Sequence, residues 1–237
     1  MKSGILSAVA GLEEIFDDQR NGHLGPGDVA GSVPDPQRSY EKKFVVGPQR
    51  ESIGERELRF QARLFELLKA GDFVILDSAG YTGVDQYFRS GGNGETVYTR
   101  LRLSSNQSCR KSTKIRTGPR GNQVKRQVDI WIPYRDFESE RQSLIWQGKT
   151  SKKFAQFRIG QVGKIWMVRD RSGHVVEIVL YQAARSDIPS QIQLFAEIDP
   201  RNCPNEKIAN GMTSRYAKLL GLRQESRMGL AEMFGPS

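Results

Sequence analysis

Cysteine and histidine are both scarce in this chain, and their positions exclude several kinds of site. Its two cysteines, Cys109 and Cys203, lie far apart and without the spacing of metal ligands. Neither a disulfide framework nor a zinc site is therefore predicted. The two histidines, His23 and His174, lie in a predicted linker and at a predicted hairpin turn. A Ser-His-Asp site or a histidine-dependent nuclease would lack its second partner.

Long hydrophobic runs and a phosphate-binding loop are also missing. The first 16 residues contain one lysine and a short apolar run soon interrupted by acids, which is unlike a signal peptide and too short to span a membrane. The glycine-rich segment 91–94 lacks the lysine and the following helix of a P-loop. We expect no contact with a membrane, no nucleotide site, and a cytoplasmic or nucleoid-associated location.

What the chain has in excess is positive charge. It has 237 residues and a formal net charge of +9, which favours polyanionic partners. A chain of this length can bury roughly 70% of its unfolded surface, so we expect a self-sufficient core. Residues 1–49 are predicted to form an N-terminal arm and linker, and residues 50–237 a single domain.

Hydrophobic periodicity predicts strands between helices. A helix is expected over 51–70, with Leu58, Ala62 and Phe65 on its apolar face and with Leu64, Leu67 and Leu68 widening that face. A long loop is expected over 77–94. Further strands are expected over 73–76, 96–103, 164–169, 174–182 and 191–198, a hairpin arm over 109–121, and helices over 205–220 and 225–234. This order predicts an α+β fold with a mixed central β-sheet flanked by helices.

The segment from Thr96 to Val128 contains no Asp or Glu and many basic residues. Neutralising several phosphates at once would release counterions and strengthen binding. Tyr98 is the one aromatic residue in the segment, which favours duplex over single-stranded DNA. The predicted DNA-binding residues are Arg110, Lys111, Lys114, Arg116, Arg120, Lys125 and Arg126.

The segment 123–153 is the best candidate for chemistry. Two apolar strands joined by a charged turn are expected there, with Asp129 in the first and Gln147 and Lys149 in the second. Alternation would place Gln147 and Lys149 on one face, and pairing could bring Asp129 beside them. Metal-dependent phosphodiester hydrolysis needs a carboxylate, a second oxygen ligand and a cation.

These residues resemble the motifs of the PD-(D/E)XK nuclease superfamily, in the variant whose second motif begins with glutamine. The resemblance implies a restriction-endonuclease-like core, here with an extra β-hairpin arm, and a Mg²⁺ ion held by Asp129, Gln147 and the carbonyl of Gly148. It implies that Lys149 orients the attacking water, and that a helix acid, for which we choose Glu57, completes the site. The other acids considered are Glu55, Glu66 and Asp77.

Two functions from different classes follow. The first is a Mg²⁺-dependent endonuclease of duplex DNA, such as a type II restriction enzyme, acting as a homodimer because symmetric cleavage calls for paired sites. The second is a non-enzymatic nucleic-acid-binding β-protein of jelly-roll type, such as a viral capsid or movement protein. The string Gly163–Met167 resembles one in geminivirus coat proteins, and the sequence leaves both functions open.

Overall fold

The protein is built around one antiparallel sheet of nine strands, in the order β5-β4-β3-β2-β6-β7-β8-β1-β9. The computed structural model describes residues 41–235, apart from residue 49 and the segments 93–94, 105–108, 118–122, 150–154 and 227–228. The strands are β1 (Lys42–Val45), β2 (Phe73–Gly92), β3 (Glu95–Ser104), β4 (Cys109–Thr117), β5 (Gln123–Ile132), β6 (Ala155–Asp170), β7 (Val175–Arg185), β8 (Ile188–Pro200) and β9 (Gln224–Glu225).

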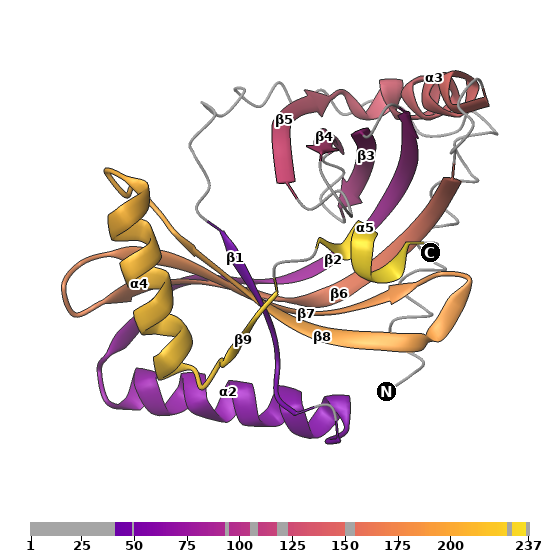
Figure 1. The fold of residues 1–237 in the computed structure, drawn as a ribbon. Helices are drawn as coiled ribbons and strands as arrows, with labels where there is room; N and C mark the ends of the chain where they lie inside the picture. The colour runs from indigo at the N-terminus through magenta and orange to yellow at the C-terminus, as the bar shows by residue number, and fades with distance from the viewer. Residues whose placement is uncertain are drawn as a thin grey trace.

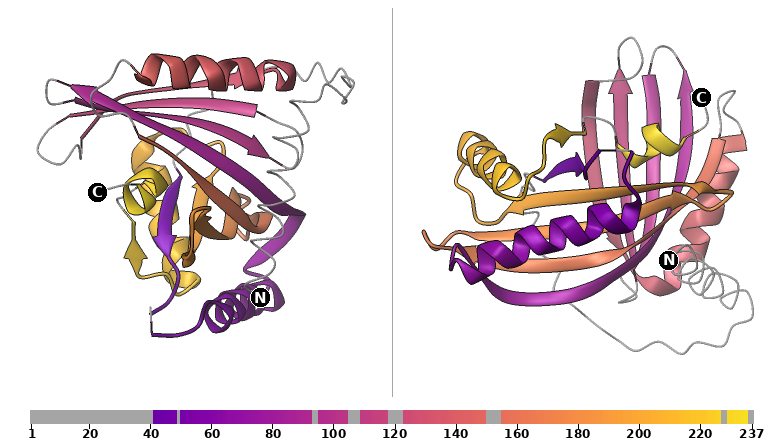
Figure 2. Two further views of the ribbon diagram at one scale, coloured as in Figure 1. Left: turned by 90° about the vertical axis from the view of Figure 1, so that its right-hand side faces the viewer. Right: turned by 90° about the horizontal axis from the view of Figure 1, so that it is seen from below.

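The sheet is strongly curved, and helices lie on both of its faces (Figures 1 and 2). On its outer, convex face α2 (Ile53–Lys69) and α4 (Glu206–Leu219) cover one half, and α3 (Phe137–Lys149), which follows the short 3-10 helix η2 (Tyr134–Asp136), covers the other. The short helix α5 (Leu230–Phe234) packs on the inner, concave face against Tyr87, Phe157 and Phe195. Both faces of the central strands are therefore buried.

Helix α2 confirms the helix expected over 51–70 but buries only part of the expected face. Ser52 caps it, because its hydroxyl accepts from the Glu55 amide at 3.2 Å while the Glu55 carboxylate accepts from the Ser52 amide at 2.8 Å. Phe60 and Leu64 face the core, whereas Leu58 is 66% exposed. Leu64 and Leu67 are buried as expected, but the side with Leu58 and Phe65 is exposed, because leucine and phenylalanine occur on both sides of this helix.

Strand β6 has no room for a side chain at Gly163. A Cβ atom added at Gly163 would lie 2.0 Å from the carbonyl oxygen of Leu180 and 2.6 Å from the Cα atom of Tyr181. Strands β6 and β7 can therefore approach this closely only where β6 has no side chain.

The predicted hairpin around residues 170–173 is confirmed as the turn between β6 and β7, and Asp170 fixes it. The Asp170 carboxylate accepts from the Ser172 and His174 amides, each at 2.9 Å, and from the Tyr216 hydroxyl of α4 at 2.6 Å. Burial would raise the pKa of Asp170, but these hydrogen bonds, led by that of Tyr216, lower it below the ordinary 3.8.

We expect Asp170→Ala to lower the free energy of unfolding by about 3 kcal/mol, because three donors lose a buried acceptor. Urea unfolding at neutral pH measures the loss, and Asp187→Ala, which removes an exposed acid that pairs with Arg185, should cost less than about 1 kcal/mol. Since the folded pKa of Asp170 is depressed, its contribution is present above the ordinary carboxyl pKa and disappears as the pH falls. Equal losses for both variants would contradict this role.

Three expected elements were wrong, and with two of them the fold class. The helix expected over 225–234 is only α5, which begins at Leu230, while Glu225 belongs to β9 and pairs with β1. The long loop over 77–94 is most of β2, which pairs with β3 on one side and β6 on the other, so its glycines and acids are held by two ladders. The second strand of the candidate site is helix α3, in which Phe137 and Leu144, one heptad apart, are buried. The single all-antiparallel sheet is neither a mixed, restriction-endonuclease-like core nor the paired sheets of a jelly roll.

Strand β1 lies inside the segment expected to be an arm and linker, and it pairs with β8 and β9. Within the described ranges, no helix is both long enough and apolar enough to cross a membrane.

Candidate functional site

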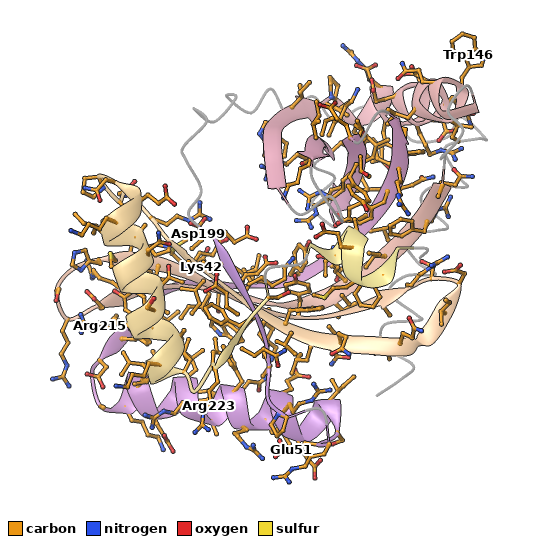
Figure 3. The ribbon with its side chains drawn as sticks, in the orientation of Figure 1. Lys42, Glu51, Trp146, Asp199, Arg215 and Arg223 are labelled. Atoms are coloured by element: carbon orange, nitrogen blue, oxygen red, sulfur yellow. The ribbon has the colours of Figure 1, made fainter. Side chains whose placement is uncertain are left out.

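Charged side chains from four strands meet on the concave face. Strand alternation places Lys43 of β1 beside Glu197 of β8, and Asp85 of β2 beside Arg102 of β3. We call the following ten residues the concave cluster: Glu41, Lys43, Tyr81, Asp85, Tyr87, Arg100, Arg102, Gln161, Tyr181 and Glu197. Figure 3 shows how densely side chains fill the space enclosed by the curved sheet.

Asp85 is the centre of one half of this cluster and has no exposed surface. The Arg102 guanidinium donates two hydrogen bonds to it, from Nε to Oδ1 at 2.6 Å and from Nη2 to Oδ2 at 2.9 Å. Oδ2 also accepts from the Tyr87 hydroxyl at 3.1 Å and from the Gln161 amide at 2.7 Å. Burial would raise the pKa of Asp85, but Arg102 and then Arg100 outweigh it and lower the pKa to about 2. Asp85 therefore carries a permanent negative charge.

The two arginines keep unused hydrogen-bond donors. Arg100 donates from Nη2 to the Ser112 hydroxyl at 3.0 Å and places Nη1 3.7 Å from Asp85 Oδ2, while its Nε is buried without a partner. In Arg102, no hydrogen bond joins Nη1 to any residue that the structure describes. A buried guanidinium donor without an acceptor costs free energy, as at Arg100 Nε, and Arg102 Nη1 is a second donor that an incoming anion could use.

Glu41 and Glu197 form the other half of the concave cluster. Glu197 accepts from the Tyr181 hydroxyl at 2.5 Å and lies 3.3 Å from the Lys43 ammonium. A hydrogen bond joins the two carboxyl groups, and the negative charge of Glu197, more than burial, raises the pKa of Glu41 to about 7. Burial would raise the pKa of Glu197 too, but Lys43, Tyr181 and Arg102 together lower it. The pair therefore holds one proton near neutral pH.

Arg102 connects the two halves. Its positive charge lowers the pKa of both Glu41 and Glu197, although β3 and β8 are separated by three strands in the order of the sheet. Only the curvature of the sheet brings them together. The concave cluster thus combines three cations (Lys43, Arg100 and Arg102) with three carboxyl groups (Asp85, Glu41 and Glu197).

Strand β4 extends the basic surface toward the edge of the sheet. Arg110 pairs with Arg102 and Lys114 with Tyr98, so both residues lie on the concave face. Lys111 points the other way and contacts Glu140 of α3. Among the other predicted DNA-binding residues, Arg120 lies outside the described residues. The structure describes the backbone but not the side chains of Arg116, Lys125 and Arg126.

Aromatic rings and α5 form an apolar floor beside the concave cluster. The rings of Tyr87 and Phe157 stack with their centroids 5.3 Å apart, and Phe234 of α5 meets Phe195 edge-on at 6.5 Å. Arg185 fixes α5 by donating from Nη1 to the Phe234 carbonyl at 3.0 Å. The charges therefore lie in a surrounding of low polarity, which strengthens their interactions.

The residues predicted from the nuclease motifs lie on separate elements. Asp129 lies in β5 opposite Ser112, and the structure does not describe its side chain. Gln147, exposed on α3, donates to the Ser143 hydroxyl at 3.1 Å. Lys149 ends the same helix, and two residues of a helix separated by one position do not share a face, so the expected alternation of Gln147 and Lys149 was wrong. Gly148 lies between them and is buried.

Glu57 is not near this segment. It lies on α2, where it accepts from Gln61 and from Gln182 of β7, each at 3.0 Å. Helices α2 and α3 cover different halves of the sheet (Figure 1). Trp146, which lies just before Gln147 in the segment predicted to be a strand, is 72% exposed and projects outward from α3 (Figure 3).

Sequence reasoning overlooked Glu41, Lys43 and Glu197 and counted Arg100 and Arg102 only as part of a basic segment. One signal could have found some of them. Charges two residues apart that alternate with apolar residues, as Arg100 and Arg102 do with Leu101 and Leu103, predict a charged strand face.

Comparisons with known proteins found similarity in structure but not in sequence. No protein-family model matches the chain, and no curated protein is significantly similar. The PH1819 protein of Pyrococcus horikoshii is similar in structure over 83% of this chain and 97% of its own, with a TM-score of 0.51 and 14% identity. At this identity the likeness shows a shared fold alone.

Two further solved structures are similar at lower scores. One is a candidate adenylate cyclase of Bacillus halodurans, with a TM-score of 0.47 and 10% identity over 84% of this chain and 98% of its own. The other is the capping enzyme triphosphatase of mimivirus, with a TM-score of 0.41 and 9% identity over 78% of this chain and 90% of its own.

Proposed function

We propose that the concave cluster binds an anion made of linked phosphates together with a divalent cation, Mg²⁺, and hydrolyses a phosphoanhydride bond in that anion. One observation carries the proposal: Arg100, Arg102 and Lys43 converge on the same concave face as the Glu41–Glu197 pair. Opposite charges grouped in this way suit a ligand that brings both signs, as a metal–polyphosphate complex does.

The Glu41–Glu197 pair fits Mg²⁺ better than a cation that needs a full protein cage. Mg²⁺ is usually held by one or two carboxylates, with water and substrate phosphates as its other ligands. In the part of the chain that the structure describes, no group of three or more His, Cys, Asp or Glu side chains could hold a metal. When bound, such a cation would polarise a phosphoryl oxygen and neutralise developing charge.

The arginines supply the anion-binding half. A guanidinium presents several donors in a plane that matches phosphate oxygens, and it stays charged at all working pH values. The free donors at Arg100 Nε and Arg102 Nη1 can each donate to a phosphate oxygen without breaking a hydrogen bond of the protein. Donors fixed in advance, on an apolar floor, stabilise charge on a transferring phosphoryl group.

Release of inorganic phosphate tests this function. We expect the protein to release phosphate from tripolyphosphate in Mg²⁺, to stop when EDTA removes the cation, and to leave a phosphate monoester intact. Colorimetric phosphate assay over a range of enzyme concentrations measures it. Equal rates with EDTA and Mg²⁺, or no release from any compound with linked phosphates, would contradict hydrolysis.

The raised pKa of Glu41 predicts a pH-dependent affinity for Mg²⁺. Because the cation must displace the proton held by the Glu41–Glu197 pair, we expect its affinity to fall about tenfold for each pH unit below 7. Calorimetric titration with MgCl₂ between pH 5.5 and 8.5 measures the slope, and Glu41→Gln should flatten it. Stability of the metal-free protein should change with pH in the opposite direction to Mg²⁺ affinity. The protonated Glu41 contributes fully to stability below its ordinary pKa of 4.5, and this contribution is lost as the pH rises through about 7.

Binding and cleavage of duplex DNA, and a homodimer, stay predictions from the sequence. The fold on which the nuclease hypothesis depended is wrong, and the structure gives Asp129, Gln147 and Glu57 no common site. Supercoiled plasmid incubated with the protein and Mg²⁺ would show cleavage on a gel as open-circular or linear DNA.

A further inference from the structure

Asp85 is an unusual residue to find in the middle of an anion-binding surface. Its carboxylate accepts four hydrogen bonds, from Arg102 twice and from Tyr87 and Gln161 once each. Protonation does not relieve its charge, because the neighbouring arginines hold its pKa far below neutrality. Any phosphate that approaches Arg100 or Arg102 must therefore do so beside a fixed negative charge.

Asp85 leaves the arginines some of their hydrogen-bond donors, but its negative charge offsets much of their positive charge. Arg102 still has Nη1, and Arg100 still has Nε. Above about pH 8, where the Glu41–Glu197 pair has lost its proton, the three cations of the concave cluster are balanced by three carboxylates. A polyphosphate would then find hydrogen-bond donors in the concave cluster, but the ten residues of the cluster would carry no net charge to attract it.

A divalent cation changes this balance. Bound between Glu41 and Glu197, it would turn the concave cluster from neutral to doubly positive, and Arg102 lies close enough to both carboxylates for the two halves to share one field. Removal of the Asp85 carboxylate would instead make the cluster positive without any cation. Charge, not donor number, would then decide whether the anion binds alone.

We propose that Asp85 makes anion binding conditional on the divalent cation, because its buried carboxylate cancels one arginine charge and keeps the metal-free concave cluster from attracting linked phosphates. This inference rests on the proposed function. It assigns Asp85 a specificity role distinct from the simpler one of holding two arginines in place. The two roles predict opposite effects when the carboxylate is removed.

Calorimetric titration with sodium tripolyphosphate, in EDTA and in Mg²⁺ at about pH 8.5, where Glu41 is ionised, separates them. The wild type should bind at least tenfold more weakly in EDTA than in Mg²⁺. In EDTA, Asp85→Asn should bind at least tenfold more tightly than the wild type, and the gain from Mg²⁺ should shrink. If Asp85 only holds the arginines, Asp85→Asn binds no more tightly than the wild type in EDTA, and the inference is overturned.

A second pair of variants tests the same charge effect at another position, should Asp85→Asn fail to fold in a thermal melt. Ser112 accepts from Arg100 Nη2 at 3.0 Å, so Ser112→Asp adds a carboxylate to the arginines and Ser112→Asn adds a neutral group of the same size. In EDTA, Ser112→Asp should bind tripolyphosphate at least threefold more weakly than Ser112→Asn. Equal binding by these two variants overturns the inference.

The wild type alone distinguishes failure of the inference from failure of the proposed function. If it binds tripolyphosphate equally well in EDTA and in Mg²⁺, the concave cluster binds anions but Asp85 does not impose the condition. If it binds in neither, the proposed function is wrong and the inference falls with it.

Discussion

Replacing Arg102 with leucine is expected to abolish tripolyphosphate binding and to lower the free energy of unfolding by about 3–5 kcal/mol, as for other broken buried ion pairs. Arg102 supplies a free donor to the anion, and its fork holds both oxygens of Asp85. Its removal would leave a fully buried carboxylate with Arg100, 3.7 Å away, as its nearest cation. Urea unfolding and calorimetric titration measure the two effects.

Two further variants make this result specific. Arg102→Lys keeps the charge but not the fork, so we expect an intermediate loss of both affinity and stability. Arg59→Leu removes an arginine from an exposed ion pair with Glu51 on α2, and it should change the free energy of unfolding by less than about 1 kcal/mol and leave tripolyphosphate affinity unchanged. Arg102→Leu with wild-type affinity would show that the anion, if it binds, lies elsewhere.

Glu197→Gln is expected to reduce Mg²⁺-dependent phosphate release about a thousandfold, because a metal contributes several kcal/mol to the stabilisation of charge in such transition states. Glutamine has almost the same shape and can still accept from Tyr181, so the loss would come from the charge. The matched control is Glu225→Gln, since Glu225 forms an exposed pair with Lys42 at the edge of the sheet.

The same variant separates the metal-binding half of the concave cluster from the anion-binding half. In EDTA, loss of the Glu197 charge should leave tripolyphosphate affinity unchanged or raise it, whereas Arg102→Leu should abolish it. If Glu197→Gln lost the same amount of tripolyphosphate affinity with and without Mg²⁺, Glu197 would act through the fold and not through a cation.

Local signals in the sequence located several elements well. Asn205 and Gly221 bound α4 because a side-chain cap and a residue with positive φ are short-range requirements. The turn over 170–173 and the strand over 96–103 were likewise confirmed. These features depend on neighbours within a few residues, so a single sequence contains them.

Longer-range features were not predictable in the same way. The segment Leu144–Lys149 favours a strand by composition, yet it is the last part of a helix whose buried positions, Phe137 and Leu144, pack on the sheet. Residues 77–92 favour a loop by their glycines and acids, yet pairing on both sides makes them a strand. In both cases tertiary packing overrode local preference.

The concave cluster shows the same limit. Glu41 and Glu197 are 156 positions apart, and Arg102 reaches them only because the sheet curves. Alternation predicts which face of its own strand each charge occupies. It does not predict which strands face one another across the curved sheet.

Calorimetric titration of the wild-type protein with tripolyphosphate, in the presence of Mg²⁺ at pH 8, is the decisive measurement for the concave cluster. We predict saturable binding of one anion per chain, strongly weakened by EDTA and abolished in Arg102→Leu. Absence of binding by the folded wild-type protein, or binding that survives Arg102→Leu unchanged, would contradict the assignment of the concave cluster as a site for linked phosphates and a divalent cation.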